Sequence, residues 1–282
     1  MCRNWKLIGR TSLLLAAAAF GTVVSLSHHA ARAQDATRAP DTARACTAPF
    51  DLVRLVHPLK RTAEKIAAGQ PLTVVAIGSS STAGAGASAE AMKYPSRLAV
   101  ELRQTFPGEN IRVLNRGVNG EEAREMLDRF EKDVMAEKPD LVLWQVGTNS
   151  VLRDNSPATA NLMIREGVRR LKASGADVVL IDPQFAPRVI AKPEAEVMVE
   201  VISAAAKEAN VDVFQRFAVM RHWHERGELP FAAFITPDDL HLNDWGYGCW
   251  AKLLGSAITD AANRTQTQSV ATRRPQARRP AP

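Results

Sequence analysis

Short apolar segments alternate with amphipathic segments from Leu72 to Thr259, and this alternation limits the possible folds of the chain more than any other feature. Each apolar segment is nearly continuous, which is typical of central parallel strands covered on both faces. The segments between them repeat their apolar residues at helical spacing. This pattern predicts α/β architecture: a single doubly wound (flavodoxin-like) domain with a central parallel sheet of about five strands and helices on both faces. The predicted strands are 72–78, 111–115, 141–146, 177–181 and 211–214.

Two helices can be placed with this pattern. One precedes the first strand, at about 58–68, and a longer one covers 121–137 after the second strand. In the longer helix the apolar residues recur every three or four positions. The apolar residues that define it are Ala123, Met126, Leu127, Phe130 and Val134.

The two ends of the chain predict segments that lie outside this domain. Residues 1–33 begin with basic residues, continue with an apolar run from Ser12 to Leu26 and end in Ala31-Arg32-Ala33, which is typical of a cleaved secretory signal peptide. The alternative is a retained membrane anchor, although the run is shorter than the ~20 residues that a spanning helix needs. We predict a signal peptide over 1–33, a linker over 34–47, the folded domain over 48–263 and a disordered Arg/Pro-rich tail over 264–282.

The positive charge of the chain follows these ends rather than the domain. The formal net charge is +6, but 1–33 carry four basic residues and 264–282 carry five arginines, with no acid in either segment. The body between them is therefore slightly acidic, at about −3. This distribution argues against a nucleic-acid partner. The signal peptide predicts a periplasmic or secreted protein with no transmembrane segment after cleavage.

Export also changes how the three cysteines are interpreted. Cleavage removes Cys2 and leaves Cys46 and Cys249 in an oxidising compartment, where an even pair favours a disulfide. The alternative is two unpaired buried thiols, because cysteine is often a small core residue. A bridge between them would close a loop of ~200 residues and contribute about 4–5 kcal/mol in the chain-entropy model.

The loop after the first strand allows two nucleotide-binding interpretations, and its spacing argues against both. The run Gly84-Ala85-Gly86-Ala87-Ser88-Ala89 has the letters of a dinucleotide fingerprint. Its glycines begin six residues after the strand rather than in the turn that follows it. A phosphate-binding loop would need a Gly-Lys-Ser/Thr run, which this loop lacks.

A nucleophilic serine is the third interpretation of the same loop. Sites in open parallel sheets form beyond the carboxyl ends of the strands, where the turn Gly78-Ser79-Ser80-Ser81-Thr82 lies. A serine becomes a nucleophile when a base accepts its proton and a carboxylate orients that base. His241 is the best candidate base, because Asp238 lies three residues earlier in a loop and can reach its Nδ1.

The other histidines of the predicted domain fit structural or surface roles better than catalytic ones. His57 precedes Pro58 at a helix start, where a surface or capping role is expected. His222 and His224 lie two residues apart in a helical segment and point to different faces, which disfavours a metal site.

Four segments of the chain together resemble the SGNH (GDSL-type) serine hydrolase family, and the resemblance spans about Leu72 to Leu254. They occur in the family's order, each after a strand or before the last helix. The segments are Val74-Val75-Ala76-Ile77-Gly78-Ser79-Ser80-Ser81-Thr82-Ala83-Gly84, Val113-Leu114-Asn115-Arg116-Gly117-Val118-Asn119-Gly120-Glu121, Val146-Gly147-Thr148-Asn149 and Asp238-Asp239-Leu240-His241-Leu242-Asn243.

The resemblance implies a role for each matching residue. Ser80 is the expected nucleophile, His241 the base and Asp238 the carboxylate that orients it. The expected oxyanion hole consists of the backbone N–H groups of Ser80 and Gly120 and the side-chain amide of Asn149. No metal or organic cofactor is needed for this chemistry.

Two positions depart from the family pattern. Ser79 stands where the family has an acid before the nucleophile, and Ser150 stands where it has an acid after the asparagine. The first change leaves Ser79 and Ser81 as alternative nucleophiles, with the register of Gly78 and Thr82 favouring Ser80.

The resemblance implies a secreted serine esterase, acting on acetyl or short-acyl esters of an envelope or extracellular carbohydrate. Hydrolysis of lipid esters or thioesters and acyl transfer to another hydroxyl use the same residues and stay open. A non-catalytic envelope-binding protein is the alternative from another class. The expected partner is thus a small-molecule or polysaccharide ester. Four tryptophans could line a sugar or acyl site, although core packing is expected for most: Trp144, Trp223, Trp245 and Trp250.

Overall fold

All five predicted strands form one parallel sheet in a computed structural model, which describes residues 46–273 of the chain. The strand order is β2-β1-β3-β4-β5, the flavodoxin-like order, so the predicted fold class is confirmed. The strands are β1 (Leu72–Gly78), β2 (Ile111–Gly117), β3 (Leu141–Gln145), β4 (Asp177–Ile181) and β5 (Asp212–Phe214). The central strands β1 and β3 are buried along almost their whole length, because helices cover the sheet on both sides.

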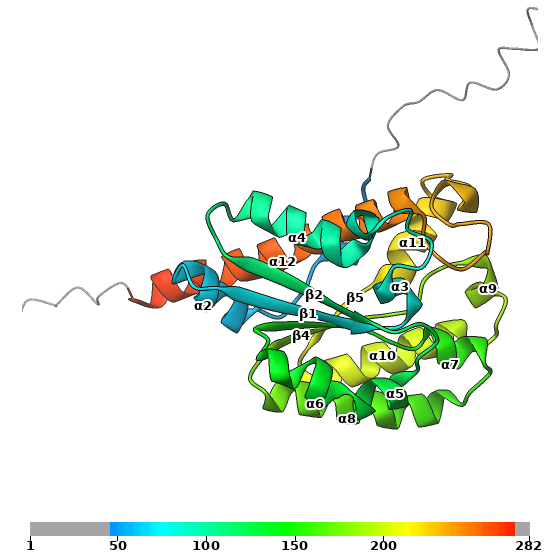
Figure 1. The fold of residues 1–282 in the computed structure, drawn as a ribbon, viewed down its shortest axis with the longest axis horizontal. Coiled ribbons are helices and arrows are strands. Elements are labelled where there is room, and N and C mark those ends of the chain that lie inside the picture. The colour runs from blue at the N-terminus through cyan, green and yellow to red at the C-terminus, as the bar shows by residue number, and fades with distance from the viewer. Residues whose placement is uncertain (1–45, 274–282) are drawn as a thin grey trace, which may run out of the picture. The chain divides into compact units, whose positions relative to one another are not determined.

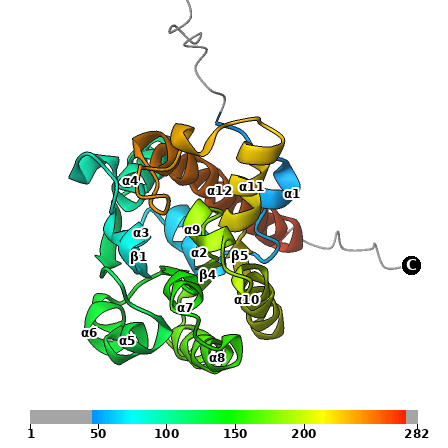
Figure 2. The same ribbon diagram turned by 90° about the vertical axis from the view of Figure 1, so that its right-hand side faces the viewer.

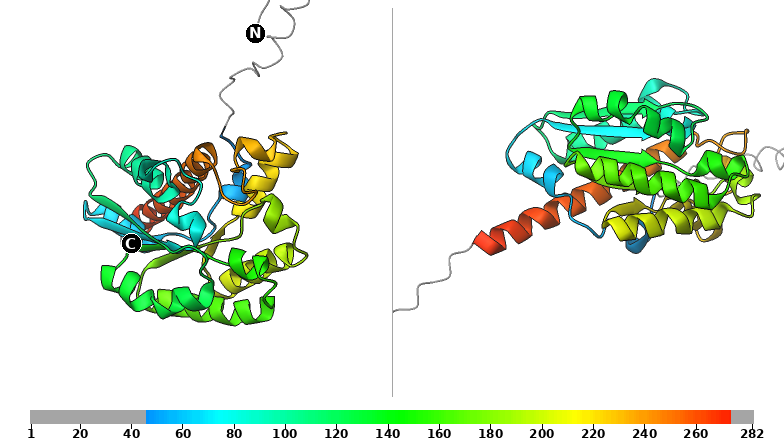
Figure 3. Two further views of the ribbon diagram at one scale, coloured as in Figure 1. Left: turned by 45° about the vertical axis from the view of Figure 1, so that its right-hand side comes forward. Right: turned by 90° about the horizontal axis from the view of Figure 1, so that it is seen from below.

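Two layers of helices enclose the sheet (Figure 1). One face is covered by α2 (Lys60–Ala67), α4 (Tyr94–Thr105) and α12 (Asp244–Arg273). The other is covered by α5 (Ala123–Asp128), α6 (Phe130–Asp133), α8 (Pro157–Ala173) and α10 (Ala195–Ala209). Figure 3 shows the same layers in two further views. Other elements outside the two layers are α1 (Phe50–Val53), α11 (Arg216–Glu225) and the 3-10 turns η1 (Glu90–Met92), η2 (Met135–Glu137) and η3 (Phe231–Ala233).

Three short helices follow the carboxyl ends of the strands. They are α3 (Ser80–Ala83) after β1, α7 (Thr148–Leu152) after β3 and α9 (Pro187–Ile190) after β4. Figure 2 looks onto this edge of the sheet, where α3, α7 and α9 lie near one another. The motif residues therefore meet at the edge that the topology predicts for a site.

The segment 121–137 differs from the single helix that its periodicity predicts. It is divided into α5, α6 and η2, with non-helical backbone at Arg129 (φ −107°) and Val134 (φ −120°). Phe130 and Val134 are both fully buried. Burial of these two side chains therefore outweighs the backbone hydrogen bonds that one unbroken helix would make.

The last helix is longer than the composition of the tail predicts. α12 continues through residues 264–273, the first part of the expected Arg/Pro-rich tail. Arg264 Nε donates to Asp260 Oδ2 across one helical turn at 2.9 Å. Extending an existing helix by a residue costs far less than starting one, because each added residue gains a hydrogen bond.

The predicted disulfide between Cys46 and Cys249 is present, with the two Cα atoms 5.3 Å apart. It joins the start of the described chain to the first turns of α12. The indole N–H of Trp223 also donates to the Thr47 carbonyl at 3.1 Å, so two contacts hold this segment. The predicted signal peptide over 1–33, the first part of the linker and residues 274–282 lie outside the described residues. Within 46–273, no helix combines the length and the apolarity that crossing a bilayer requires.

Gly117, the last residue of β2, is in close contact with α3. A Cβ at this position would lie 2.0 Å from the backbone N of Ala83, far inside van der Waals contact. We expect Gly117→Ala to push α3 away from the sheet and lower the free energy of unfolding by at least about 2 kcal/mol. Thermal unfolding should show a midpoint about 4–8 °C lower.

A glycine in the interior of α12 provides the control for this prediction. A Cβ at Gly255 would meet only side-chain atoms of Glu101 and Leu98, at 3.1 Å or more. Gly255→Ala should leave the midpoint at or slightly above the wild-type value, since alanine favours the helix by about 1 kcal/mol over glycine. Equal midpoints for Gly117→Ala and wild type would contradict the close packing of β2 on α3.

Candidate active site

Ser80 is the first residue of α3, directly after β1, and its Oγ lies 2.8 Å from Nε2 of His241. The neighbouring serines are placed differently. Ser79 and Ser81 are each only 2% exposed, and the Ser79 hydroxyl donates to Gln145 Oε1. Ser80 is half-buried and faces the histidine. Of the three consecutive serines, Ser80 thus has the surroundings that a nucleophile needs.

A tight loop brings His241 and Asp238 together. His241 Nδ1 lies 2.5 Å from Asp238 Oδ2, which leaves Nε2 directed at Ser80. Asp239, in the middle of the loop, adopts a left-handed conformation (φ 58°). The Thr236 N–H donates to the His241 carbonyl at 2.8 Å and closes the loop. The spacing of three residues thus turns the carboxylate back onto the imidazole.

Hydrogen bonds keep the Asp238 carboxylate ionised. Partial burial alone would raise its pKa, but the Thr236 hydroxyl and the His241 backbone N–H donate to Oδ1 at 2.6 and 2.9 Å. The His241 ring and the Leu240 N–H add two further contacts. Together these donors outweigh burial and lower the pKa well below its usual range. An ionised carboxylate at this place stabilises a protonated imidazole.

Gly120 and Asn149 lie on two different elements beside the Ser80 turn. Gly120, in the loop between β2 and α5, has a φ of +80°, a conformation that glycine adopts at little cost. Asn149 belongs to α7, and its Nδ2 donates to the Glu121 carbonyl at 2.8 Å. An amide nitrogen carries two hydrogens, so this bond leaves a second one for a bound ligand.

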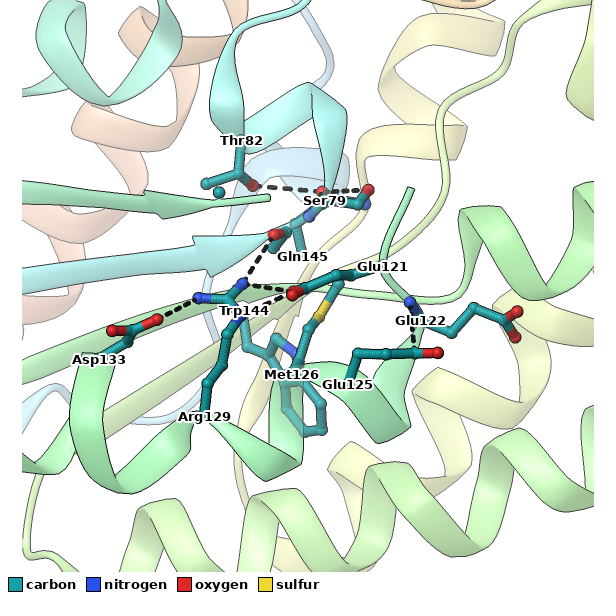
Figure 4. Close-up of polar contacts among 12 residues, drawn as sticks. Ser79, Thr82, Glu121, Glu122, Glu125, Met126, Arg129, Asp133, Trp144 and Gln145 are labelled. Carbon is teal, nitrogen blue, oxygen red and sulfur yellow. Dashed lines mark hydrogen bonds and ion pairs between the residues drawn. The ribbon is translucent and has the colours of Figure 1, made fainter. Parts of the chain in front are cut away.

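Gln145, at the end of β3, is a buried polar residue that the sequence interpretation did not select. Its Oε1 accepts the Ser79 backbone N–H at 2.9 Å and the hydroxyls of Ser79 and Thr82 at 3.2 Å (Figure 4). These bonds fix both sides of the Ser80 turn to the neighbouring strand. A polar residue in an otherwise apolar strand was the sequence signal that could have indicated it.

Gln184, which follows β4, connects two of the motif segments. Its Oε1 accepts the Thr148 hydroxyl at 2.9 Å, and its Nε2 donates to the Leu240 carbonyl at 3.3 Å. Thr148 precedes Asn149 and Leu240 precedes His241, so one buried amide holds the neighbours of both. The sequence interpretation did not select this residue either.

A buried arginine lies behind Gln184. Arg216 Nη2 donates to Gln184 Oε1 at 2.8 Å, and its Nε donates to the Asp182 carbonyl at 3.0 Å. Its guanidinium lies over the Trp250 ring, 4.9 Å from the centroid. Burial lowers the pKa of Arg216 to about 10 and raises that of the Asp182 carboxyl to about 7. Arg216 therefore holds Gln184, whose amide contacts both Thr148 and Leu240.

The remaining candidates from the sequence lie away from Ser80. Three of the four tryptophans are core residues with at most 2% exposure, namely Trp144, Trp223 and Trp250. Trp245 is half-buried and lies beside the disulfide. His57 Nδ1 lies 3.3 Å from Asp212 Oδ1 just before α2. His224 stacks on Phe231 with ring centroids 4.0 Å apart. In the described part of the chain no three His, Cys, Asp or Glu side chains group as metal ligands.

The parallel sheet carries a serine, a histidine and a carboxylate in contact at its carboxyl edge, which is the arrangement of a serine hydrolase. Within this class, the chain belongs to the non-GDSL lipase-like family, whose family model matches residues 45–264. The resemblance deduced from the four motif segments is therefore confirmed at the level of the family.

Two curated proteins have similar segments. An acetylxylan esterase from Geobacillus stearothermophilus is 42% identical over 52 residues, which is 18% of this chain and 24% of that protein. Esterase TesA from Pseudomonas aeruginosa is 31% identical over 95 residues, which is 32% of this chain and 47% of TesA. The matches thus span less than half the length of these relatives.

Solved structures share the fold at low sequence identity. A two-domain esterase (CEX) active on acetylated mannans superposes with a TM-score of 0.63 and 23% identity, covering 83% of this chain and 60% of that one. The acetylxylan esterase Axe2 from Geobacillus stearothermophilus gives a TM-score of 0.57 and 23% identity, covering 66% of this chain and 94% of Axe2.

Proposed function

We propose that this protein is a serine esterase that hydrolyses carboxylic esters, with Ser80 as nucleophile, His241 as general base and Asp238 as its orienting carboxylate. The observation that carries the proposal is the continuous contact from Ser80 Oγ through His241 to Asp238, at 2.8 and 2.5 Å. Membership of a lipase-like family and the similarity to esterases support it.

The reaction proceeds by two acyl transfers. His241 Nε2 takes the Ser80 proton as Oγ attacks the ester carbonyl, and Asp238 stabilises the imidazolium that forms. The tetrahedral intermediate collapses, the bond to the leaving alcohol breaks, and His241 returns the proton to that alcohol. Water then attacks the acyl-serine with His241 as base, which releases the carboxylic acid and restores Ser80.

The negative charge of the tetrahedral intermediate requires donors that are already in place. The Ser80 N–H lies in the first turn of α3, where helical N–H groups have no partner within the helix. The Gly120 N–H and the second hydrogen of Asn149 Nδ2 complete the proposed oxyanion hole. Such donors stabilise the transition state more than the ground state, which is what raises kcat.

The role of Asn149 can be tested by removing its amide. We expect Asn149→Ala to lower kcat by about 10²–10³-fold with little change in KM, because the lost donor acts mainly in the transition state. Steady-state kinetics on a soluble ester would measure both constants. The matched control is Asn161→Ala on α8, whose amide oxygen accepts a hydrogen bond from Arg165 of the same helix. Equal kcat values for Asn149→Ala and wild type would remove Asn149 from the oxyanion hole.

We further propose acetyl or short-acyl esters of an envelope or extracellular carbohydrate as the substrate, and a periplasmic or secreted location. The similar segment of the acetylxylan esterase and the fold shared with an esterase active on acetylated mannans support the carbohydrate. The cysteine pair joined as a disulfide supports an oxidising compartment.

The substrate is tested with two series of esters. Acetate release from acetylated xylo- and manno-oligosaccharides is measured beside hydrolysis of 4-nitrophenyl esters from acetate to decanoate. We expect acetate release from the oligosaccharides and the highest kcat/KM for acetate or propionate among the nitrophenyl esters. A maximum at octanoate or decanoate would favour a lipid or thioester substrate. The product of acyl transfer to an added sugar would identify an acyltransferase.

A further inference from the structure

The loop that carries Gly120 contains two consecutive glutamates, and each of them is paired with a different arginine. Glu121 contacts Arg129, and Glu122 contacts Arg153. Both arginines also donate to backbone carbonyls at the site. They therefore connect this oxyanion loop, residues 118–122, to elements on both sides of it.

Arg129 connects the oxyanion loop to the Ser80 turn. Its Nε donates to Glu121 Oε2 at 2.7 Å, and its Nη2 donates to the Gly78 carbonyl at 3.2 Å. Asp133 accepts from Nη1 at 3.0 Å, so Arg129 lies between two carboxylates (Figure 4). The Arg129 and Glu121 side chains are each only 14% exposed, which limits screening of the pair by water.

Arg153 connects the same loop to α7, the helix that carries Asn149. Its Nη2 donates to the Gly120 carbonyl at 2.7 Å, and its Nη1 donates to Glu122 Oε1 at 2.6 Å. The Ser150 hydroxyl donates to the other carboxylate oxygen of Glu122 at 2.7 Å. Partial burial opposes ionisation of Glu122, but hydrogen bonds from Arg153, Asn155 and Ser150 outweigh it and lower the pKa of its carboxyl.

The oxyanion loop has further contacts at both of its ends. At Glu122 the backbone N–H donates to Glu125 Oε2 at 3.0 Å, and Asn155 Nδ2 donates to both carboxylate oxygens at 2.9 and 3.0 Å. The Val118 N–H donates to the Gly78 carbonyl at 3.0 Å, and Asn149 donates to the Glu121 carbonyl. Between these contacts Gly120 has φ +80°, and glycine permits many other conformations at low cost. The direction of the Gly120 N–H therefore depends on the contacts that hold the peptide groups on either side of Gly120. Arg153 holds the Gly120 carbonyl directly, and Arg129 holds the Glu121 side chain.

We propose that Arg153 and Arg129 are positioning residues that hold the oxyanion loop in the conformation that receives the transition-state oxyanion. This inference rests on the proposed esterase function. Neither guanidinium touches the reacting atoms: Arg153 acts through Gly120, and Arg129 acts through Glu121. An oxyanion donor displaced by about 1 Å loses much of its effect on the rate, since stabilisation depends on fixed geometry. Each arginine also donates to a backbone carbonyl, Arg129 to Gly78 and Arg153 to Gly120. A surface ion pair without a positioning role would not need these contacts.

Arg153→Ala is the sharper test, because this side chain is 49% exposed and its loss leaves the core intact. We expect kcat to fall about 10–100-fold while KM stays within about twofold, the pattern of a loss in transition-state stabilisation. The rate of Ser80 phosphonylation by a fluorophosphonate should fall in parallel, because that reaction also places negative charge in the oxyanion hole. Arg153→Lys keeps the charge and should recover part of kcat.

The matched control is Arg169→Ala on α8. Arg169 is 69% exposed and its guanidinium pairs with Glu166 of the same helix, so only a surface ion pair is lost. Its kcat, KM and unfolding midpoint should equal those of wild type. Arg129→Lys tests the second arginine, since lysine cannot reach Glu121, Asp133 and Gly78 together. We expect the same fall in kcat at unchanged KM.

The outcomes separate the two levels of the proposal. Wild-type protein without ester hydrolysis or Ser80 labelling would overturn the proposed function and this inference with it. Active wild type with Arg153→Ala at wild-type kcat would overturn the positioning role alone. A fall in kcat that accompanies a lower unfolding midpoint and a raised KM would also overturn it, because that pattern describes general loosening of the fold.

Discussion

Ser80→Ala is expected to lower ester hydrolysis by about five to six orders of magnitude, with the fold intact. The hydroxyl removed is the one that lies 2.8 Å from His241 Nε2, and alanine offers no atom to attack the carbonyl or to form the acyl intermediate. Hydrolysis of a 4-nitrophenyl ester and covalent labelling by a fluorophosphonate, mapped by mass spectrometry, would measure the loss. The unfolding midpoint should stay near that of wild type, because Ser80 is only half-buried.

The neighbouring serines are the controls that test the assignment of the nucleophile. Ser81→Ala should keep most of the activity and all of the labelling at Ser80. Ser79→Ala should lose more, since the Ser79 hydroxyl bonds to Gln145 beside the turn, but labelling should still map to Ser80. A probe adduct on Ser79 or Ser81, or undiminished hydrolysis by Ser80→Ala, would contradict the assignment.

Replacing both Cys46 and Cys249 by alanine is expected to lower the free energy of unfolding by about 4–5 kcal/mol. The disulfide spans 203 residues of sequence, so its loss frees nearly the whole domain in the unfolded chain. Urea unfolding followed by tryptophan fluorescence would measure the change. The catalytic constants at 25 °C should stay close to those of wild type, because Cys249 lies in α12 and the bridge does not touch Ser80 or His241.

Reduced wild-type protein is the matched control for this change. With a reductant present, wild type and the double variant should unfold at similar urea concentrations. Without a reductant, Cys46 and Cys249 should be absent from a thiol titration of denatured wild type. Two reactive thiols at these positions, or equal stability of oxidised wild type and the variant, would contradict the predicted contribution of the bridge.

The spacing of the motif segments predicted which residues would meet at the site. Ser80 follows the first strand and Asn149 the third, and parallel strands place their carboxyl ends at one edge of the sheet. The pair Asp238 and His241 could be predicted from local geometry alone, because a loop of four residues brings the carboxylate back to the ring. The doubly wound fold class and the cysteine pair followed from pattern and composition in the same way.

The supporting polar residues could not be predicted, because their partners lie far away in the sequence. Gln145 accepts from Ser79, 66 positions earlier, and Gln184 donates to Leu240, 56 positions later. Arg153 reaches Gly120 across 33 positions. Gln145 stands out only as a polar residue in an apolar strand, and Gln184 and Arg153 have no periodicity or spacing that marks them.

The sequence by itself thus determined the order of strands and helices, the residues at the strand ends and the chemistry they suggest. Periodic burial and local turns carry that information, because they depend on neighbours within a few positions. Only the tertiary structure decided which of three serines faces His241, where the 121–137 helix breaks, and which side chains hold the oxyanion loop. These features depend on side chains packed from distant segments, where burial and the pairing of polar groups outweigh local preference.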